Sequence, residues 1–259
     1  MAAFLNALSN VFTLAFVVTS MLAMGLSLTI PQIAGALRNG RLVALALVAN
    51  FVIVPAVAFG LAQIIPLDKD LKTGLILFGA AAGAPFLPKL AQIAKANVAL
   101  AVGLMALLVV VTVVYLPLVL PLLLPGISVD SGKIALSLFL EMLVPLAIGL
   151  CIKARYAEAA ASLQPPVAQI SNISLVLLLV LMLGLNLGNV LALLGTGAII
   201  GMVALIVVAV GSGYLLGGPG TESRRVLALG TGQRNLAAAF VIATGNFANQ
   251  PNVLVLLAA

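Results

Sequence analysis

Long apolar runs separated by short polar links make up almost the whole chain. Each run has about twenty residues, the length that an α-helix needs to cross the ~30 Å hydrocarbon core of a bilayer. The pattern therefore predicts an all-α polytopic membrane protein with about nine transmembrane helices. The predicted spans cover residues 4–30, 42–65, 71–94, 97–124, 134–152, a run after the Gln164–Pro166 link up to 187, 190–217, a run after Arg225 up to 247, and an apparently truncated ninth starting at 251.

Two of these runs carry polar and helix-breaking residues near their centres. They are the segments Gly79–Lys89 and Leu229–Ala239. Glycine and proline forfeit helical hydrogen bonds, and lipid offers no replacement partner, so the freed groups must meet neighbouring protein or a wet cavity. Because the two runs are the third and the eighth spans, they cross the membrane in opposite directions. This arrangement is typical of an inverted repeat with two broken helices at a midplane site.

Composition and charge support a membrane protein and indicate its orientation. The chain is 64% hydrophobic and only 7% charged, with a mean hydropathy of +1.32, which excludes an ordinary soluble domain. The net charge of +6 lies in short loops, so it does not indicate a nucleic-acid partner. The loops after odd-numbered spans are basic, which places the N-terminus outside by the positive-inside rule. Their basic residues are Arg38, Arg41, Lys95, Lys153, Arg155, Arg224 and Arg225.

Few residues could perform covalent chemistry. The chain has no histidine and a single cysteine, Cys151, and no cluster resembles a metal site or an activated nucleophile. We therefore expect neither an enzyme nor a cofactor. The N-terminus lacks the basic start of a signal peptide, so the first run is interpreted as a retained span.

The ordered segments resemble one known family, the bile acid:sodium symporters (BASS), in its bacterial branch. The matching segments are Met24–Leu28, Asn50–Pro55, Lys95–Leu100, Gly211–Gly217 and Gly232–Ala239. The resemblance implies a multi-pass protein of a bacterial inner (plasma) membrane with two domains. A panel domain would comprise 1–30 and 134–187, and a core domain 42–124 and 190–259. Substrate would bind in the crevice between them.

The chain departs from the family at the positions that would bind sodium. The family's oxygen ligands correspond here to Leu87, Pro88, Ala101, Met105 and Leu229, whose side chains offer no oxygen. Of the two glutamines that the family uses at its second sodium site, one is kept as Gln233 and the other is replaced by Asn50. The resemblance therefore implies an abolished first sodium site and a weakened second one, and whether sodium binds is left open.

Two cations accompany these losses and suggest a hypothesis. Lys89 and Arg234 lie at the two breaks, where a buried charge usually marks a ligand or ion path. We expect them to replace sodium and to bind a small organic anion, with the planar fork of Arg234 holding the anionic group. The predicted substrate-binding residues are Arg234, Lys89, Asn235 and Thr231. The predicted site-forming residues are Gln233, Asn50, Gly232 and Gly230, with Glu141 as a proton carrier or charge partner.

Simpler interpretations and other functions remain open. Lys89 could extend along apolar surface to a headgroup. Asn50 and Gln233 could serve only as hydrogen bonds between helices, and the glycines only as close-packing residues. The protein could also keep sodium coupling, or bind a ligand as a receptor or subunit without transporting it. Oligomeric state is not predicted.

Overall fold

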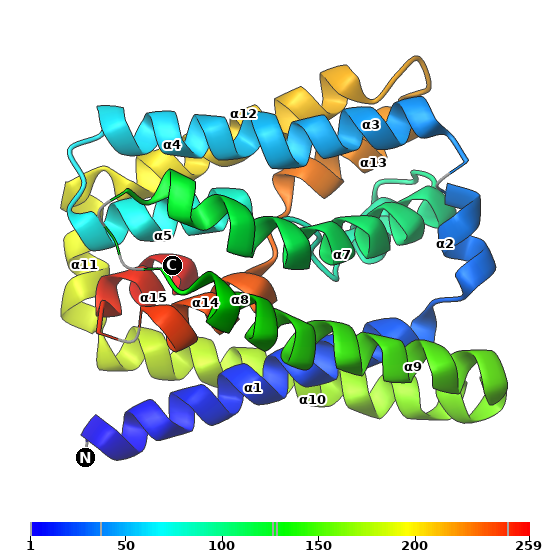
Figure 1. Ribbon diagram of the computed structural model, residues 1–259, viewed down its shortest axis with the longest axis horizontal. Helices are drawn as coiled ribbons and strands as arrows, with labels where there is room; N and C mark the ends of the chain where they lie inside the picture. The colour runs from blue at the N-terminus through cyan, green and yellow to red at the C-terminus, as the bar shows by residue number, and fades with distance from the viewer. Residues whose placement is uncertain (1, 37, 126, 128, 248) are drawn as a thin grey trace.

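The computed structural model describes residues 2–36, 38–125, 127, 129–247 and 249–259. Within these residues the regular elements are all helical (Figure 1). Seven helices are long and apolar enough to cross a membrane, which makes the protein a multi-pass integral membrane protein. They are Ala7–Ser27, Gly40–Ile64, Val98–Leu123, Ser131–Arg155, Ala157–Gly184, Ala198–Leu216 and Thr221–Asn246.

The first half of the chain forms four of the predicted runs. The run at 71–94 is divided by a break, as its glycines and prolines predict. The elements are α1 (Ala2–Ser27), α2 (Ile30–Ala36), α3 (Gly40–Val48), the π-helical turn η1 (Ala49–Ile53), α4 (Val54–Ile64), α5 (Lys69–Ala80), α6 (Leu87–Ile93) and α7 (Val98–Leu123).

The second half repeats the pattern of long helices and contains the other break. Its elements are α8 (Ser131–Leu138), the π-helical turn η2 (Phe139–Leu143), α9 (Val144–Arg155), α10 (Ala157–Leu185), α11 (Leu187–Thr196), α12 (Ala198–Leu216), α13 (Thr221–Gly232), α14 (Leu236–Asn246) and α15 (Pro251–Ala258).

Two sequence predictions need correction. The Gln164–Pro166 link is not a link, because α10 starts at Ala157 and continues through Pro165 and Pro166. Both prolines are exposed, so water or a polar ligand can reach the carbonyls that they leave unpaired. The single span predicted at 190–217 is instead divided into α11 and α12 at Gly197. Gly197 has a φ of 79°, a left-handed conformation that commonly ends a helix and that glycine adopts most readily.

The helices pack in two groups, which Figure 1 displays below and above the middle of the view. In one group α1 lies along α9 and α10. Gly25 and Gly149 allow this contact, because a Cβ atom on either would collide with the backbone of the opposite helix. In the other group α12 packs on α13 and α4, α4 on α5, and α6 on α7.

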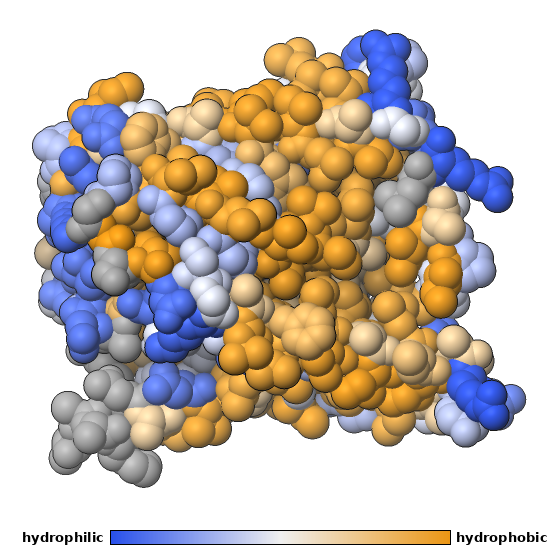
Figure 2. Space-filling model, in the orientation of Figure 1, coloured by the Kyte–Doolittle hydropathy of each residue, from blue (hydrophilic) through white to orange (hydrophobic). Residues whose placement is uncertain are grey.

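The surface has an apolar belt between two polar ends (Figure 2). At one end, on the right of Figures 1 and 2, the chain turns between α1 and α3, between α6 and α7, after α9, and between α12 and α13. We call this the basic end. Its basic residues are Arg38, Arg41, Lys95, Lys153, Arg155, Arg224 and Arg225, and its acidic residues are Glu158 and Glu222.

Candidate substrate and ion site

The two helix breaks meet inside the protein. α5 ends at Ala80 and α6 starts at Leu87, while α13 ends at Gly232 and α14 starts at Leu236. The Asn235 N–H donates to the carbonyl of Ala81 at 2.9 Å. The Thr112 hydroxyl accepts from the Ala82 N–H at 3.3 Å and donates to the Ala82 carbonyl at 3.0 Å. Protein groups therefore satisfy backbone that the breaks set free, as the sequence predicted.

Arg234 lies at this crossing and is only 6% exposed. Its Nη2 donates to Asn50 Oδ1 at 2.8 Å, its Nη1 to the Gly79 carbonyl at 3.1 Å, and its Nε to the carbonyl of Gln233 at 3.2 Å. Within the described part of the chain these acceptors are neutral oxygens. The guanidinium charge is therefore held by carbonyl dipoles at the crossing.

Asn50 is oriented by both ends of its side-chain amide. Its Nδ2 donates to the Ala46 carbonyl at 3.0 Å and to Thr231 Oγ1 at 3.2 Å, which leaves Oδ1 to accept from Arg234. The residue belongs to η1, just before Pro55. A π-turn of this kind often accompanies a functional site, because it re-aims a side chain out of the helical register.

Tyr115 was missed by sequence reasoning. Pro55 has no N–H, so the carbonyl of Phe51, four residues earlier, loses its helical donor. The Tyr115 hydroxyl donates to that carbonyl at 2.8 Å, and the rings of Phe51 and Tyr115 lie 4.8 Å apart. The signal in the sequence is Pro55 itself, which requires a donor without indicating which residue provides it.

Two buried side-chain atoms at the crossing are unpaired in the described structure. Gln233 Oε1 and Asn235 Nδ2 are buried and have no hydrogen-bond partner among the described residues. Asn235 uses its Oδ1 to cap α14, accepting from the Ala238 N–H at 3.1 Å. Buried amide atoms normally find a partner, so these two can accommodate a small polar species such as water.

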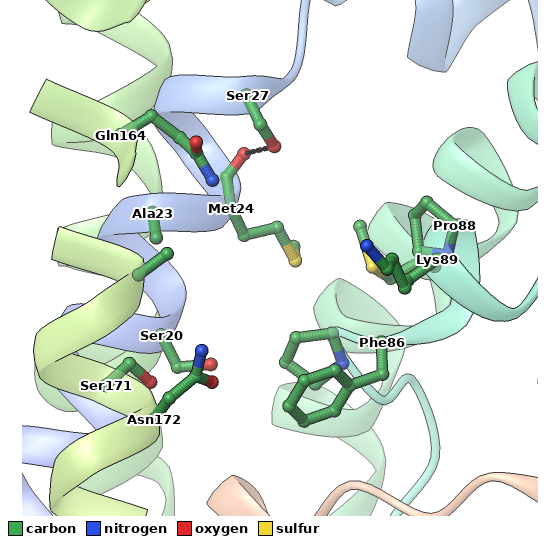
Figure 3. Close-up of a pocket in the computed structure, with 13 residues that line it drawn as sticks. Ser20, Ala23, Met24, Ser27, Phe86, Pro88, Lys89, Gln164, Ser171 and Asn172 are labelled. Atoms are coloured by element: carbon green, nitrogen blue, oxygen red, sulfur yellow. Dashed lines mark hydrogen bonds between the residues drawn. The ribbon is translucent and has the colours of Figure 1, made fainter. Parts of the chain in front are cut away.

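A cavity of about 420 Å³ lies next to the crossing, between α1 and α10 on one side and the α5–α6 break, α6 and α7 on the other. Figure 3 shows Ser20, Ser171 and Asn172 facing Phe86, Pro88 and Lys89 across it. Lys89 carries the only charge among the residues that line it. The full lining is Ser20, Ala23, Met24, Ser27, Pro85, Phe86, Pro88, Lys89, Met105, Gln164, Ala168, Ser171 and Asn172.

The two walls differ in chemistry. The wall from α1 and α10 offers neutral hydroxyl and amide groups, while the opposite wall is apolar apart from Lys89. Ser171 and Ser27 already donate to backbone carbonyls, of Phe16 at 3.3 Å and of Met24 at 2.8 Å. The amides of Gln164 and Asn172 make no hydrogen bond within the described chain, so they are free to bind a ligand. Sequence reasoning missed this wall because lone Gln and Asn residues carry no distinctive spacing.

The predicted site residues thus fall into two places. Arg234, Asn50, Thr231, Gln233 and Asn235 come together at the crossing. Lys89 is exposed on the cavity wall, and no hydrogen bond between described residues joins it to that cluster.

The remaining predicted residues have packing roles or no bonded partner. Gly230 lies against the side chains of Leu87 and Leu104, and Gly232 against Val210, so both allow α13 to approach its neighbours closely. Glu141 is partly buried in η2, which packs on α1. It does not line the cavity of Lys89, and no ion pair with another described residue is found.

A multi-pass helical bundle with two crossing broken helices beside a polar cavity is an architecture of secondary transporters. The chain belongs to the Sodium Bile acid symporter family, whose model matches residues 13–193. This confirms the family resemblance found in the sequence. The protein is thus a member of a transporter family and not of an enzyme family.

Two relatives are similar to this chain over most of its length. The chain is 29% identical over 240 residues to the probable sodium/metabolite cotransporter BASS2, chloroplastic, of Oryza sativa subsp. japonica, with 88% of this chain and 55% of the relative covered. It is 27% identical over 238 residues to the uncharacterized sodium-dependent transporter YocS of Bacillus subtilis (strain 168), covering 88% of this chain and 72% of that protein. The chain thus spans about half the length of the rice relative.

Proposed function

We propose that this protein is a secondary transporter that carries a small organic anion through the membrane by alternating access. The observation that carries this proposal is the cavity beside the helix crossing, in which Lys89 is the only charged lining residue. A cavity of about 420 Å³ lies in the lower half of the ~300–1,000 Å³ range of small-molecule sites. A single cation facing neutral amides suits a monoanion with a polar, uncharged remainder.

Two groups of helices would move relative to each other in this mechanism. The panel domain, residues 1–30 and 134–187, would contain α1, η2, α9, α10 and most of α8. The core domain, residues 42–124 and 190–259, would contain η1, α4–α7, α12–α15 and most of α3 and α11. The mutual packing of α1, α9 and α10 supports this division, as does the position of both breaks outside that group. Nine spans, an inverted repeat, an external N-terminus and a bacterial inner membrane belong to the same proposal.

Arg234 occupies the place of a coupling ion in this proposal. Its guanidinium donates to Asn50 Oδ1 and to the Gly79 carbonyl oxygen. A sodium ion at the crossing would need such oxygens as ligands. Three of the five positions of the missing sodium ligands are apolar and buried, with Leu87 at 1%, Ala101 at 0% and Met105 at 2% exposure, and the other two, Pro88 and Leu229, are partly buried. The substrate-binding role predicted for Arg234 therefore passes to Lys89, and Arg234 supplies a permanent charge beside the site.

Sodium coupling is the alternative that the names of both relatives favour. Transport by the wild type in proteoliposomes separates the two proposals. We expect equal uptake of an organic anion with an inward sodium gradient and with choline replacing sodium. An absolute requirement for sodium would exclude the fixed-cation proposal. Counterflow of a preloaded anion distinguishes a transporter from a receptor that binds without cycling, since only a transporter exchanges the bound molecule.

Lys89 provides a direct test of the substrate cavity. We expect Lys89→Gln to weaken binding of the anion at least about tenfold, because a charge-assisted hydrogen bond contributes roughly 1.5–3 kcal/mol. Thermal-shift titration with small carboxylates and sulfonates measures the change. Lys95→Gln is the matched control, since Lys95 is an exposed lysine near the end of α6 that does not line the cavity. Equal affinities in the wild type and Lys89→Gln would remove Lys89 from the site.

A further inference from the structure

Lys133 links α8 to α14 at the end opposite the basic end (Figure 1). Its Nζ donates to the Gly245 carbonyl at 2.5 Å, which links α8 to α14. Lys133 lies in the first turn of α8, where its backbone N–H donates to Asp130 Oδ1 at 2.9 Å. A cation is unfavourable so near a helix N-terminus, so the charge of Lys133 does not stabilise α8. Its partner lies in α14.

The Gly245 carbonyl is a suitable acceptor for this cation. It belongs to the last turn of α14, where carbonyls have no helical donor and where the helix dipole favours positive charge. α14 is one half of a broken helix in the proposed core, whereas α8 leads into the proposed panel, which begins at Ile134, one residue after Lys133. The bond therefore joins the two groups that would separate if the site opened at this end.

At the Lys133 end, helices of the proposed core and panel domains pack directly against each other. α14 contacts both α8 and α1 (Figure 1). α6, by contrast, runs from its break toward Lys95 at the basic end, and the cavity with Lys89 lies between α6 and the pair α1 and α10. The interface between the two proposed domains is thus packed at the Lys133 end, whereas the cavity opens it on the side of the basic end.

The closed end also contains unpaired polar atoms. Asn246 Nδ2 and Gln250 Oε1 are buried without a hydrogen-bond partner in the described chain, and they lie at the junction of α14 and α15. Such atoms oppose the closed arrangement, because opening to water would hydrate them. The Lys133 bond acts in the opposite sense and favours closure.

We infer that Lys133 is a positioning residue that holds the transport site closed at the α8–α14 end and thereby sets the balance between the two access states. This inference rests on the proposed alternating access. Removing the bond shifts the population toward the state that is open at the Lys133 end. Because Lys133 is exposed, we expect a shift of roughly fivefold, the lower limit of typical coupling between sites.

The test uses a cysteine reporter in the cavity. In a Cys151→Ser background, Ala168→Cys places the only thiol on the cavity wall. A membrane-impermeant charged maleimide is applied to spheroplasts and to inside-out vesicles of one expression host, so that labelling rates from the two sides can be compared. With Lys133→Met, we expect the ratio of labelling from the Lys133 side to labelling from the basic side to rise roughly fivefold.

Lys72→Met is the matched control. It removes a lysine at the same end, in the first turn of α5, whose side chain makes no hydrogen bond in the described structure. Its labelling ratio should stay within about twofold of the parent. If the parent is labelled from both sides and Lys133→Met leaves the ratio unchanged, the role of Lys133 is wrong while alternating access stands. Labelling from one side only in every variant would overturn alternating access, and the role of Lys133 with it.

Discussion

Arg234→Ala should convert a protein whose stability is indifferent to sodium into one that sodium stabilises. The substitution leaves Asn50 Oδ1 and the Gly79 carbonyl without the donors that they have at 2.8 and 3.1 Å. Each unpaired buried acceptor costs about 1–3 kcal/mol, so we expect a loss of roughly 3 kcal/mol in the free energy of unfolding. The vacated space is lined by oxygens and can accept a cation.

Sodium should restore much of this loss. A ligand present at a hundred times its dissociation constant stabilises the folded state by about 2.7 kcal/mol. The measurement is thermal unfolding in detergent across a sodium series, with choline chloride holding the ionic strength constant. Methylguanidinium, which has the planar fork of the missing side chain, should also stabilise Arg234→Ala at millimolar concentration and leave the wild type unchanged.

Arg225→Ala provides the comparison for this experiment. Arg225 lies in α13, the helix that precedes Arg234 in the chain. It donates to the Ala94 carbonyl at 3.1 Å, but it is exposed at the basic end. Its removal should produce no response to sodium. Stabilisation of the wild type by sodium, or a failure of every cation to stabilise Arg234→Ala, would contradict the view that Arg234 stands in the place of the ion.

The helical architecture and the two breaks could be predicted from the sequence because both depend on local composition. Apolar runs of membrane length require helices. Gly83 and Pro85 weaken the third run, and Gly230 and Gly232 the eighth. The same local reasoning failed at Pro165 and Pro166, where the helix continues, and at Gly197, where one expected helix is two. Local propensity does not specify which carbonyls find another partner.

The contacts of the site could not be predicted because they join distant parts of the chain. Arg234 was identified as a buried cation from its position in the eighth run. That its donors reach Asn50 and Gly79, 184 and 155 residues away in sequence, depends on how the break between α13 and α14 lies against η1 and the end of α5. The π-turn that aims Asn50 also has a partner far away in sequence, because the Tyr115 hydroxyl donates to its Phe51 carbonyl. The separation of Lys89 from Arg234 has the same origin, since it follows from the direction of α6 after its break.

Gly83→Ala should be the most damaging small substitution in the first break. Gly83 has a φ of 84°, a left-handed conformation that costs an L-residue about 1–2 kcal/mol. A Cβ atom there would lie 2.5 Å from the Val109 nitrogen and 2.8 Å from the Leu108 carbonyl carbon, both backbone atoms of α7 that cannot rotate away. Overpacking of this kind adds about 1–3 kcal/mol.

The expected total for Gly83→Ala is a loss of roughly 3–4 kcal/mol in the free energy of unfolding, from the strain and the collision together. The displaced break would also disturb the bonds of Thr112 to Ala82, so uptake should fall with stability. Gly60→Ala is the matched control, because Gly60 lies inside α4 with open space around it and alanine there favours the helix by up to about 1 kcal/mol. Thermal unfolding of both variants measures the difference in stability. If Gly83→Ala were as stable as Gly60→Ala, the left-handed turn at the break would not be needed to hold the crossing together.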